Sequence, residues 1–263
     1  MNKGFFRFEA KNVSRCNRNG GRSYTRELGY NGGINIRDSY NNQMCYNSRS
    51  DVVHFKTMLP HDAPQEFSNP QRLSDEVNKA EKRYDARTAR LFIASLPKEL
   101  PTEEHIRIVD EFVQTNFVDQ GFVAVVAIHS GINESDPQKN NPHAHILVST
   151  RTLDANGFSR IKPREMNQKE RVTEWRKQWE NVLNRALERN NLEIRVSCKS
   201  LEVQGIKREP IPHLTLADYQ KEKRGERTLA GDKKREIMKL NDGKFPVKHR
   251  KDKELDLSLD LSR

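Results

Sequence analysis

The order of hydrophobic and polar positions along the chain predicts strands and helices that interleave over most of its length. Runs rich in β-branched and aromatic residues predict strands at residues 5–15, 51–60, 90–97, 121–129 and 143–150. Apolar residues at helical spacing predict helices at residues 69–85, 102–113 and 168–190. Residues 23–30, in the middle of a segment bounded by Gly and Asn, suit a short helix. The last two strands follow one another across a polar connection, so they are expected to pair as an antiparallel hairpin with a long loop. The pattern predicts an α+β fold, with helices flanking a mostly antiparallel central sheet of about five strands.

The segments between these elements are polar and rich in turn-forming residues. Residues 34–50 are rich in Asn and are expected to form a loop. Thr102, with acidic residues directly after it, is expected to cap its helix. Beyond residue 205 the chain is basic and interrupted by Gly and Pro, and its final ELDLSLDLSR suits either an edge strand or disorder. We therefore expect one domain over residues 1–205 and a basic, partly ordered extension over residues 206–263.

The charge balance of the chain predicts a polyanionic partner. The 263 residues include 47 Lys and Arg against 37 Asp and Glu, a formal net charge of +10. Nucleic acid is the expected partner, ahead of an anionic membrane surface. The 3 widely spaced cysteines suit neither a disulfide framework nor a zinc knuckle. Because the chain has neither an apolar run near the roughly 18 residues of a membrane span nor a secretory signal, we expect a soluble cytoplasmic protein without membrane insertion.

Three histidines are expected to meet at one end of the predicted sheet. His143 and His145 lie two residues apart in a strand, so both side chains project from the same face. His129 ends the preceding strand, and in an antiparallel hairpin the end of one strand lies opposite the beginning of the next. Three neutral imidazoles suit a divalent metal and leave coordination positions open for substrate or water. Nitrogen ligands first suggest zinc, so a zinc hydrolase remains one interpretation at this point.

The segments NNPHAHILVSTR and GGRSYTRELGY resemble motifs of the MobA/MobL family of plasmid mobilisation relaxases, which belongs to the HUH endonuclease superfamily. NNPHAHILVSTR, at residues 140–151, resembles the motif in which the family places two histidines around a hydrophobic residue. GGRSYTRELGY, at residues 20–30, resembles the segment that carries the family's nucleophilic tyrosine. Further blocks between residue 5 and about residue 237 also resemble the family, among them VVHFKTMLP and EWRKQWENVLNRALERNNLEIRV.

The resemblance implies a DNA strand transferase. Such relaxases nick one strand at the transfer origin of a plasmid or mobile element, stay joined to its 5′ end through a phosphotyrosine, and reseal it after conjugative transfer. Their fold is an antiparallel five-stranded sheet backed by helices, which agrees with the hydrophobic pattern. The implied partners are transfer-origin DNA, single-stranded at the nick, a type IV secretion coupling protein and accessory relaxosome proteins. The implied place of action is the bacterial cytoplasm, from which the protein is delivered with the DNA to the recipient.

The resemblance also assigns roles to particular residues. It places a divalent metal, expected to be Mg²⁺ or Mn²⁺, on His129, His143 and His145. It places the nucleophile on Tyr30, by its spacing from the preceding glycine pair. Tyr24, six residues earlier, is the rival nucleophile. On a helix the two tyrosines would lie on largely different faces, so both are not expected to reach one metal.

The sequence departs from the family pattern at one acidic position. The family often carries an acid on the strand before its Leu-Pro pair, whereas Leu91 and Ile93 are apolar in this chain. Glu81 is the candidate substitute as general base, with an uninvolved surface glutamate as the alternative. The basic side chains expected to contact DNA are Arg22, Arg26, Lys207, Arg208, Arg224 and Arg227.

Two other functions remain open from the sequence. A rolling-circle replication initiator of the HUH type would use the same metal and tyrosine, although the resemblance after residue 170 favours the relaxase. A basic nucleic-acid-binding protein would carry the same histidines without chemistry. Formation of a covalent protein–DNA adduct separates this last function from the two enzymes.

Overall fold

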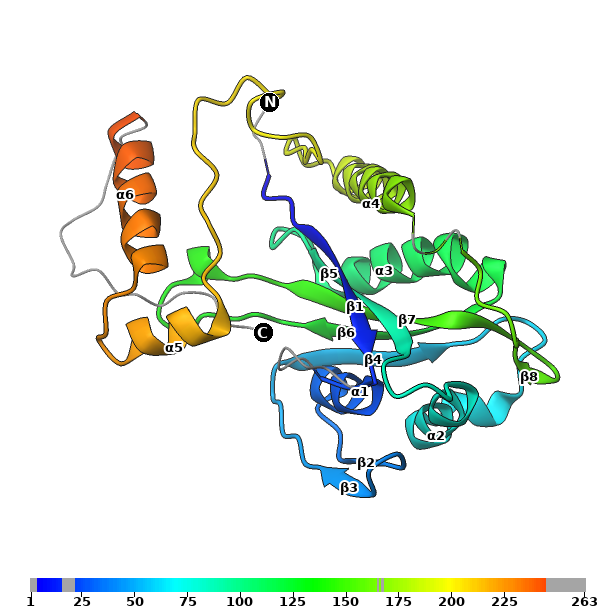
Figure 1. Cartoon of the computed structure of the whole chain (residues 1–263). Helices are drawn as coiled ribbons and strands as arrows, with labels where there is room; N and C mark the ends of the chain where they lie inside the picture. The colour runs from blue at the N-terminus through cyan, green and yellow to red at the C-terminus, as the bar shows by residue number, and fades with distance from the viewer. Residues whose placement is uncertain (1–3, 16–21, 165, 167, 245–263) are drawn as a thin grey trace. The chain divides into compact units, whose positions relative to one another are not determined.

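The computed structural model describes residues 4–15, 22–164, 166 and 168–244, and its elements are drawn in Figure 1. The chain forms two compact units, Met1–Cys198 and Lys199–Arg263. The first unit is built on a sheet with the strand order β1-β5-β7-β6-β4, in which every neighbouring pair is antiparallel. The strands are β1 (Phe8–Ser14), β4 (Val52–Met58), β5 (Arg87–Ser95), β6 (Phe122–His129) and β7 (His143–Asp154), with the short β8 (Gly157–Phe158) paired to the end of β7. The predicted antiparallel five-stranded sheet with flanking helices is confirmed.

Four α-helices cover the two faces of this sheet (Figure 1). They are α1 (Tyr24–Gly32), α2 (Pro70–Ala80), α3 (Thr102–Asn116) and α4 (Lys169–Arg189), accompanied by the short 3-10 helices η1 (Gln65–Ser68), η2 (Val118–Gln120) and η3 (Pro137–Lys139). Alternation along β7 divides its side chains between the faces: Ala144 and Ile146 pack with α3 and α4, whereas Leu147 packs with α1 and α2. Because both faces are covered, the central strands carry long apolar runs, and β6 is buried along its whole length.

An aromatic cluster fixes α3 and α4 on their face of the sheet. The ring of Phe92, in β5, lies 5.2 Å from the ring of Phe117 and 5.2 Å from that of Trp175, measured between centroids. Trp179 meets Phe112 edge to face at 5.0 Å. Each of these rings is at most 1% exposed. The cluster therefore supplies large apolar burial together with specific ring geometry.

The stretch expected to be a loop, residues 34–50, instead contains a short hairpin. Its strands are β2 (Ile36–Asp38) and β3 (Gln43–Cys45), and Asn42 in its turn has a φ of 57°. The expectation of a loop was wrong because Asn adopts this left-handed conformation readily, so Asn-rich sequence also suits tight turns. The buried Asp38 accepts a hydrogen bond of 3.0 Å from Ser23 Oγ, and Ser23 is the N-cap of α1. The hairpin and the helix are thereby tied together.

Two helix boundaries also differ from those expected. The N-cap of α3 is Pro101, so Thr102 is the first helical residue and not the cap. The helix expected over residues 69–85 ends at Ala80, and Tyr84 beyond it is exposed. Both differences concern the ends of helices, where sequence signals are weakest.

The second unit contains α5 (Leu216–Lys223) and α6 (Leu229–Lys244). The buried carboxylate of Glu222 accepts hydrogen bonds from Arg235 and from Thr228, which joins the two helices. Residues 254–263, for which an edge strand or disorder was expected, lie outside the described residues. Among the residues that are described, no helix is both long and apolar enough to cross a membrane.

The C-terminal end of α1 lies against β4 at a position that requires glycine. A Cβ atom on Gly32, the last helical residue, would lie 2.5 Å from a ring carbon of Phe55 in β4. Gly33 follows with a φ of 63°, the left-handed conformation that closes many helices. The absence of a side chain at position 32 therefore sets how closely α1 approaches the sheet.

We expect Gly32→Ala to lower the free energy of unfolding by about 1–3 kcal/mol, because the added methyl group overlaps the Phe55 ring. Urea denaturation followed by tryptophan fluorescence measures this quantity. In the double variant Gly32→Ala with Phe55→Leu, the smaller side chain relieves the overlap, so the two effects are expected not to add. Additive effects would show that this contact does not position α1.

Candidate functional site

Three histidines converge on the sheet face that α1 covers. His129, at the end of β6, lies opposite His143 at the start of β7, and His145 follows on the same face. Their ring centroids are 4.6 to 5.1 Å apart, and one nitrogen of each ring lies within 4.8 Å of the others. All three side chains are buried. The structure thus brings together the three residues that the hairpin was expected to bring together.

Backbone carbonyl groups determine which ring nitrogens of these histidines remain free. His129 Nε2 lies 2.8 Å from the Asn31 carbonyl oxygen, and His143 Nδ1 lies 2.8 Å from that of Asn141. A carbonyl oxygen only accepts, so these two nitrogens carry the hydrogen and donate it. His129 Nδ1, His143 Nε2 and both nitrogens of His145 are buried without a hydrogen-bond partner among the described residues. Buried polar atoms are rarely left unpaired, and unpaired imidazole nitrogens at this spacing suit a metal ion.

Burial keeps the three imidazoles neutral. It lowers the pKa of His143 to about 4 and the pKa of His145 well below its ordinary value, because a charged ring loses its hydration there. Burial likewise lowers the pKa of His129, and the nearby positive charge of Arg49 acts in the same direction on all three rings. Neutral rings are the form that binds a metal, so the site is ready for one at neutral pH.

Tyr30 lies next to this cluster, at the end of α1. The residue after it, Asn31, provides the carbonyl that holds His129. The half-buried Tyr30 ring contacts two guanidinium groups, with the Arg22 Cζ 3.6 Å and the Arg49 Cζ 4.7 Å from its centroid. Cations at these distances are attracted to an aromatic ring and restrict its orientation.

Tyr24, the rival nucleophile, occupies a different environment. Its side chain is 1% exposed and packs in the apolar cluster with Leu28 and Leu73. Burial raises the pKa of its phenol, and the hydroxyl has no hydrogen-bond partner in the described part of the chain. These surroundings make Tyr24 a core residue.

An ion pair that sequence reasoning missed lies between Tyr30 and the histidines. Arg49 Nε and Nη2 donate to the two carboxylate oxygens of Asp51 at 2.8 Å and 2.6 Å. Asp51 Oδ2 is in turn 3.9 Å from the free Nδ1 of His129. No local sequence signal placed this pair at the site, because it comes there through the pairing of β4 with β6, which puts Val52 opposite His129.

Glu27 is a second charged residue that sequence reasoning missed. It lies one helical turn before Tyr30, and its side chain is 13% exposed. Burial raises the pKa of its carboxyl group against the opposing charges of Arg22 and Lys11, and Arg22 Nη1 lies 3.9 Å away. The spacing of three residues within α1 was the available signal.

The structure does not bring Glu81 to the histidines. Its buried carboxylate lies 2.8 Å from Arg151 Nε and 2.8 Å from Lys162 Nζ. Arg151 is six residues beyond His145 along β7, which corresponds to about 20 Å of extended strand. This placement contradicts the expected role of Glu81 as general base, because the carboxylate neutralises two cations toward the other end of the strand.

Leu91 and Ile93, the apolar residues where the resemblance led us to expect an acid, are part of the core. Leu91 and Ile93 are buried on the sheet face covered by α1 and α2. Ile93 pairs with His145 across β5 and β7, so an apolar side chain adjoins the histidine cluster on that side.

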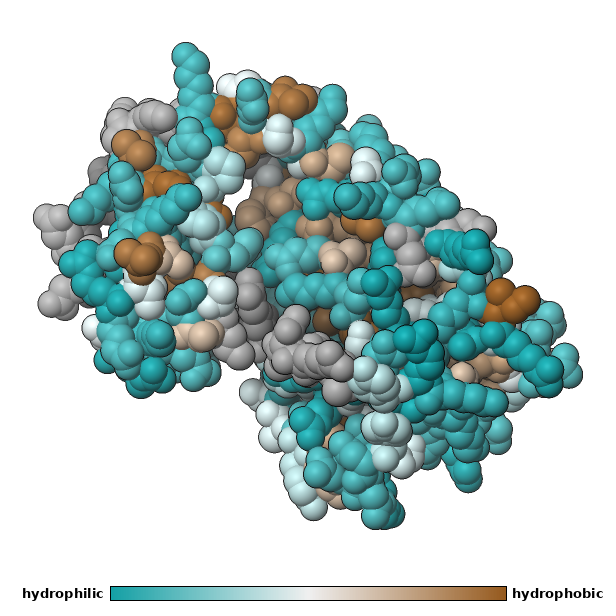
Figure 2. Space-filling model, viewed as in Figure 1, coloured by the Kyte–Doolittle hydropathy of each residue, from teal (hydrophilic) through white to brown (hydrophobic). Residues whose placement is uncertain are grey.

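The arginines and lysines expected to contact DNA fall in both units. In the first unit, Arg22 stacks on Tyr30, and the exposed Arg26 donates to Gln43. The remaining four are exposed in the second unit and are Lys207, Arg208, Arg224 and Arg227. Figure 2 shows a mostly hydrophilic surface on the face in view, as expected for a highly charged chain.

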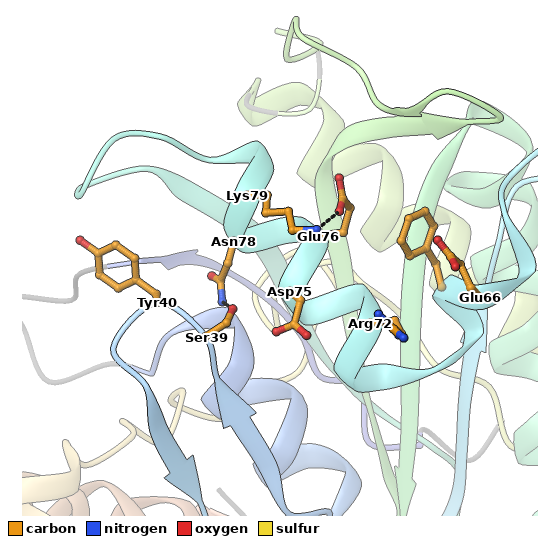
Figure 3. A pocket seen from close by; sticks show the side chains of 9 residues that line it. Ser39, Tyr40, Glu66, Arg72, Asp75, Glu76, Asn78 and Lys79 are labelled. Carbon is orange, nitrogen blue, oxygen red and sulfur yellow. Dashed lines mark hydrogen bonds and ion pairs between the residues drawn. The ribbon is translucent and has the colours of Figure 1, made fainter.

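A separate cavity of about 440 Å³ lies between the end of β2 and α2 (Figure 3). Its lining mixes acidic and basic side chains, including Asp75, Glu76, Arg72 and Lys79, with the exposed Tyr40 at one side. None of the three histidines lines it. The cavity is therefore distinct from the histidine cluster.

The chain is similar in sequence to known mobilization proteins. Residues 22–224 match the MobA/MobL family. A probable mobilization protein MobA of Bifidobacterium longum is 26% identical over 280 residues, which cover 90% of this chain and 48% of that protein. Mobilization protein A of Escherichia coli is 31% identical over 169 residues, which cover 57% of this chain and 23% of that protein. The chain thus spans about half the length of the Bifidobacterium protein and a smaller share of the Escherichia coli protein.

A solved structure described as the molecular basis of vancomycin resistance transfer in Staphylococcus aureus has the same fold. It superposes with a TM-score of 0.66 at 31% identity, covering 75% of this chain and 100% of that one. The family match extends over most of the chain, and this solved structure shares its fold. The chain belongs to the MobA/MobL family of mobilization relaxases.

Proposed function

We propose that this chain cleaves one DNA strand at the transfer origin of a plasmid or mobile element, with Tyr30 as nucleophile, and reseals the strand after transfer. The observation that carries the proposal is the buried group of three histidines with unpaired ring nitrogens. Asn31 links that group to the end of the helix that bears Tyr30. Family membership supports the proposal, as do relatives named for mobilization and for resistance transfer.

The proposed cofactor is a divalent ion, Mg²⁺ or Mn²⁺, held by His129, His143 and His145. The fit rests on one free, buried nitrogen from each ring and on the neutral state of all three imidazoles. A bound ion supplies positive charge that polarises the scissile phosphate and stabilises the charge that develops on its oxygens.

The reaction is a transesterification at phosphorus. The Tyr30 oxygen forms a bond to phosphorus while the bond from phosphorus to the 3′ oxygen breaks; the phenol loses a proton and the departing 3′ oxygen gains one. The 5′ phosphotyrosyl ester retains the energy of the broken bond, so attack by a free 3′ hydroxyl reverses the steps and reseals the strand. Arg22 and Arg49 hold the phenol ring and stabilise negative charge as it develops on the oxygen.

The proposal includes the wider organisation of the protein. Residues 1–205 form the nicking domain, and the basic residues 206–263 contact flanking DNA through Lys207, Arg208, Arg224 and Arg227. The DNA is single-stranded at the nick, and a type IV secretion coupling protein and accessory relaxosome proteins are the protein partners. The site of action is the bacterial cytoplasm, with delivery to the recipient on the transferred strand.

Tyr30→Phe is expected to lower formation of a covalent protein–DNA adduct by at least about 10³-fold, because it removes the attacking oxygen. The assay incubates the protein with oligonucleotides spanning a candidate origin and Mn²⁺, followed by a denaturing gel. Tyr24→Phe is the matched control and should keep the adduct, since that hydroxyl is buried without a partner among the described residues. Survival of the adduct in Tyr30→Phe and its loss in Tyr24→Phe would reverse the assignment.

His143→Ala combined with His145→Ala is expected to weaken Mn²⁺ binding by about 100-fold or more, because two of three ligands are lost. Isothermal titration calorimetry on the folded protein measures the dissociation constant. His61→Ala serves as the control, since that side chain is 99% exposed and is not part of the cluster. Unchanged binding in the double variant would remove the metal site from the proposal.

Without added metal, the protein is expected to lose stability as the pH falls from 6.5 toward 4. Burial lowers the pKa of His143 from 6.5 to about 4, so in this range the unfolded chain binds a proton that the folded protein does not. The free energy of unfolding should fall by about 3 kcal/mol from this residue over the range and level off below it. Urea denaturation at a series of pH values should show a shallower slope for His143→Gln than for the wild type. Equal slopes would contradict the burial argument.

A further inference from the structure

Arg49 connects the components of the candidate site. Its side chain is 13% exposed, and its guanidinium lies beside the Tyr30 ring. Two of its nitrogens are held by Asp51, whose Oδ2 approaches the free nitrogen of His129. The ion pair of Arg49 with Asp51 thus connects the candidate nucleophile to the candidate metal ligands.

The ion pair with Asp51 does not use the third nitrogen of the Arg49 guanidinium, Nη1. Asp51 engages Nε and Nη2, which form one edge of the guanidinium. Nη1 is buried and makes no hydrogen bond in the described part of the chain; the pKa of Arg49 is raised, against the effect of burial, by Asp51 and by the adjacent Tyr30 phenol. A buried charged donor is costly to leave unpaired, so this atom indicates an acceptor that arrives with a ligand.

The charge of Arg49 points to an anionic ligand. Its guanidinium lies close enough to lower the pKa of all three histidines, and it would repel a divalent ion bound to them. Asp51 balances the charge of Arg49 and Glu27 that of Arg22, so the feature that calls for an anion is the unpaired Nη1 donor of a buried guanidinium beside the Tyr30 ring. A phosphate is the anion whose oxygens match a guanidinium donor.

The Arg-x-Asp spacing does not account for this arrangement by itself. Arg83 and Asp85 have the same spacing and form the same fork, with Nε to Oδ1 at 3.0 Å and Nη2 to Oδ2 at 2.9 Å. The Arg83 side chain, however, is 80% exposed. What distinguishes Arg49 is its burial between Tyr30 and His129 with a spare donor.

We propose that Arg49 is a further catalytic residue, which donates from Nη1 to a non-bridging oxygen of the scissile phosphate, and that Asp51 is the positioning residue that fixes the guanidinium for this contact. The proposal rests on the proposed nicking function and deepens it by naming the group that binds the reacting phosphate. No proton is transferred by Arg49, since its charge is retained throughout.

The test separates phosphate recognition from chemistry by working in the Tyr30→Phe background with EDTA present. The probes are two single-stranded oligonucleotides with the sequence that the wild-type protein cleaves. One carries the ordinary phosphate at the scissile linkage and the other a neutral methylphosphonate. With Arg49 present, the methylphosphonate is expected to weaken binding by about 10-fold. With Arg49→Gln the penalty should fall below about twofold, because the partner of the phosphate charge is gone.

Arg83→Gln is the matched control and should keep the full penalty, since its Arg-x-Asp fork is exposed and lies outside the site. A penalty of the same size in Arg49→Gln and in Arg83→Gln would overturn the proposal. Circular dichroism and urea denaturation of each variant establish that it is folded before binding is measured.

A second measurement follows adduct formation in the Tyr30-containing protein with Mn²⁺. Arg49→Gln is expected to slow it by about 10²- to 10³-fold, the usual effect of losing one transition-state donor. Arg49→Lys, which keeps the charge, should recover part of the rate. Asp51→Asn should slow the reaction less than Arg49→Gln, because it loosens the guanidinium without removing its charge.

The two proposals fail in different ways. A wild-type protein that forms no adduct with any origin oligonucleotide overturns the nicking function and this inference with it. A wild-type protein that forms the adduct, together with an Arg49→Gln variant that forms it at the wild-type rate and keeps the methylphosphonate penalty, overturns this inference alone.

Discussion

The antiparallel register between β6 and β7 is the constraint on which the candidate site depends. It places His129 opposite His143 and, two residues further, His145 on the same face. A shift of one residue would turn every β7 side chain to the other face, moving the imidazoles toward the aromatic cluster and Ala144 and Ile146 toward α1. The tightly packed rings beneath α3 and α4 leave no room for such an exchange, so the core that stabilises the fold also fixes the histidines.

The same burial that fixes the imidazoles leaves them incompletely satisfied. Each ring is held in a buried, neutral state, and each keeps at least one nitrogen without a partner among the described residues. Removing polar atoms from water without replacing their hydrogen bonds is unfavourable, and the apolar surroundings make it more so. The fold tolerates this because His129 and His143 gain one backbone carbonyl each, from Asn31 and Asn141. The ring nitrogens that stay without a hydrogen bond lie together, where a bound ligand can pair with them, as is common at functional sites.

The sequence was sufficient for the parts of the site that depend on consecutive elements. The meeting of His129 with His143 and His145 follows from a hairpin, in which the register is local. The Arg49–Asp51 pair could not be found in this way, because it reaches the site through the pairing of β4 with β6, two strands that are far apart in the sequence. The role of Glu81 was predicted wrongly for the same reason. Its ion-pair partners, Arg151 and Lys162, come from a much later part of the chain. The periodicity of a sequence predicts helices and strands, but it does not predict which distant strands pair with one another.

The charges around Tyr30 explain why such a site would favour the attacking complex over the resting one. Arg22 and Arg49 are matched by Glu27 and Asp51, and the histidines are neutral, so these residues carry no net charge among themselves. A divalent ion in the proposed site would add two positive charges that none of them cancels. In the proposed reaction, a phosphodiester brings one negative charge and the attacking phenol develops a second. The two positive charges of the ion are neutralised only when the phosphodiester and the attacking phenol both carry negative charge. The electrostatic stabilisation is therefore greatest in the transition state, which is the condition for catalysis.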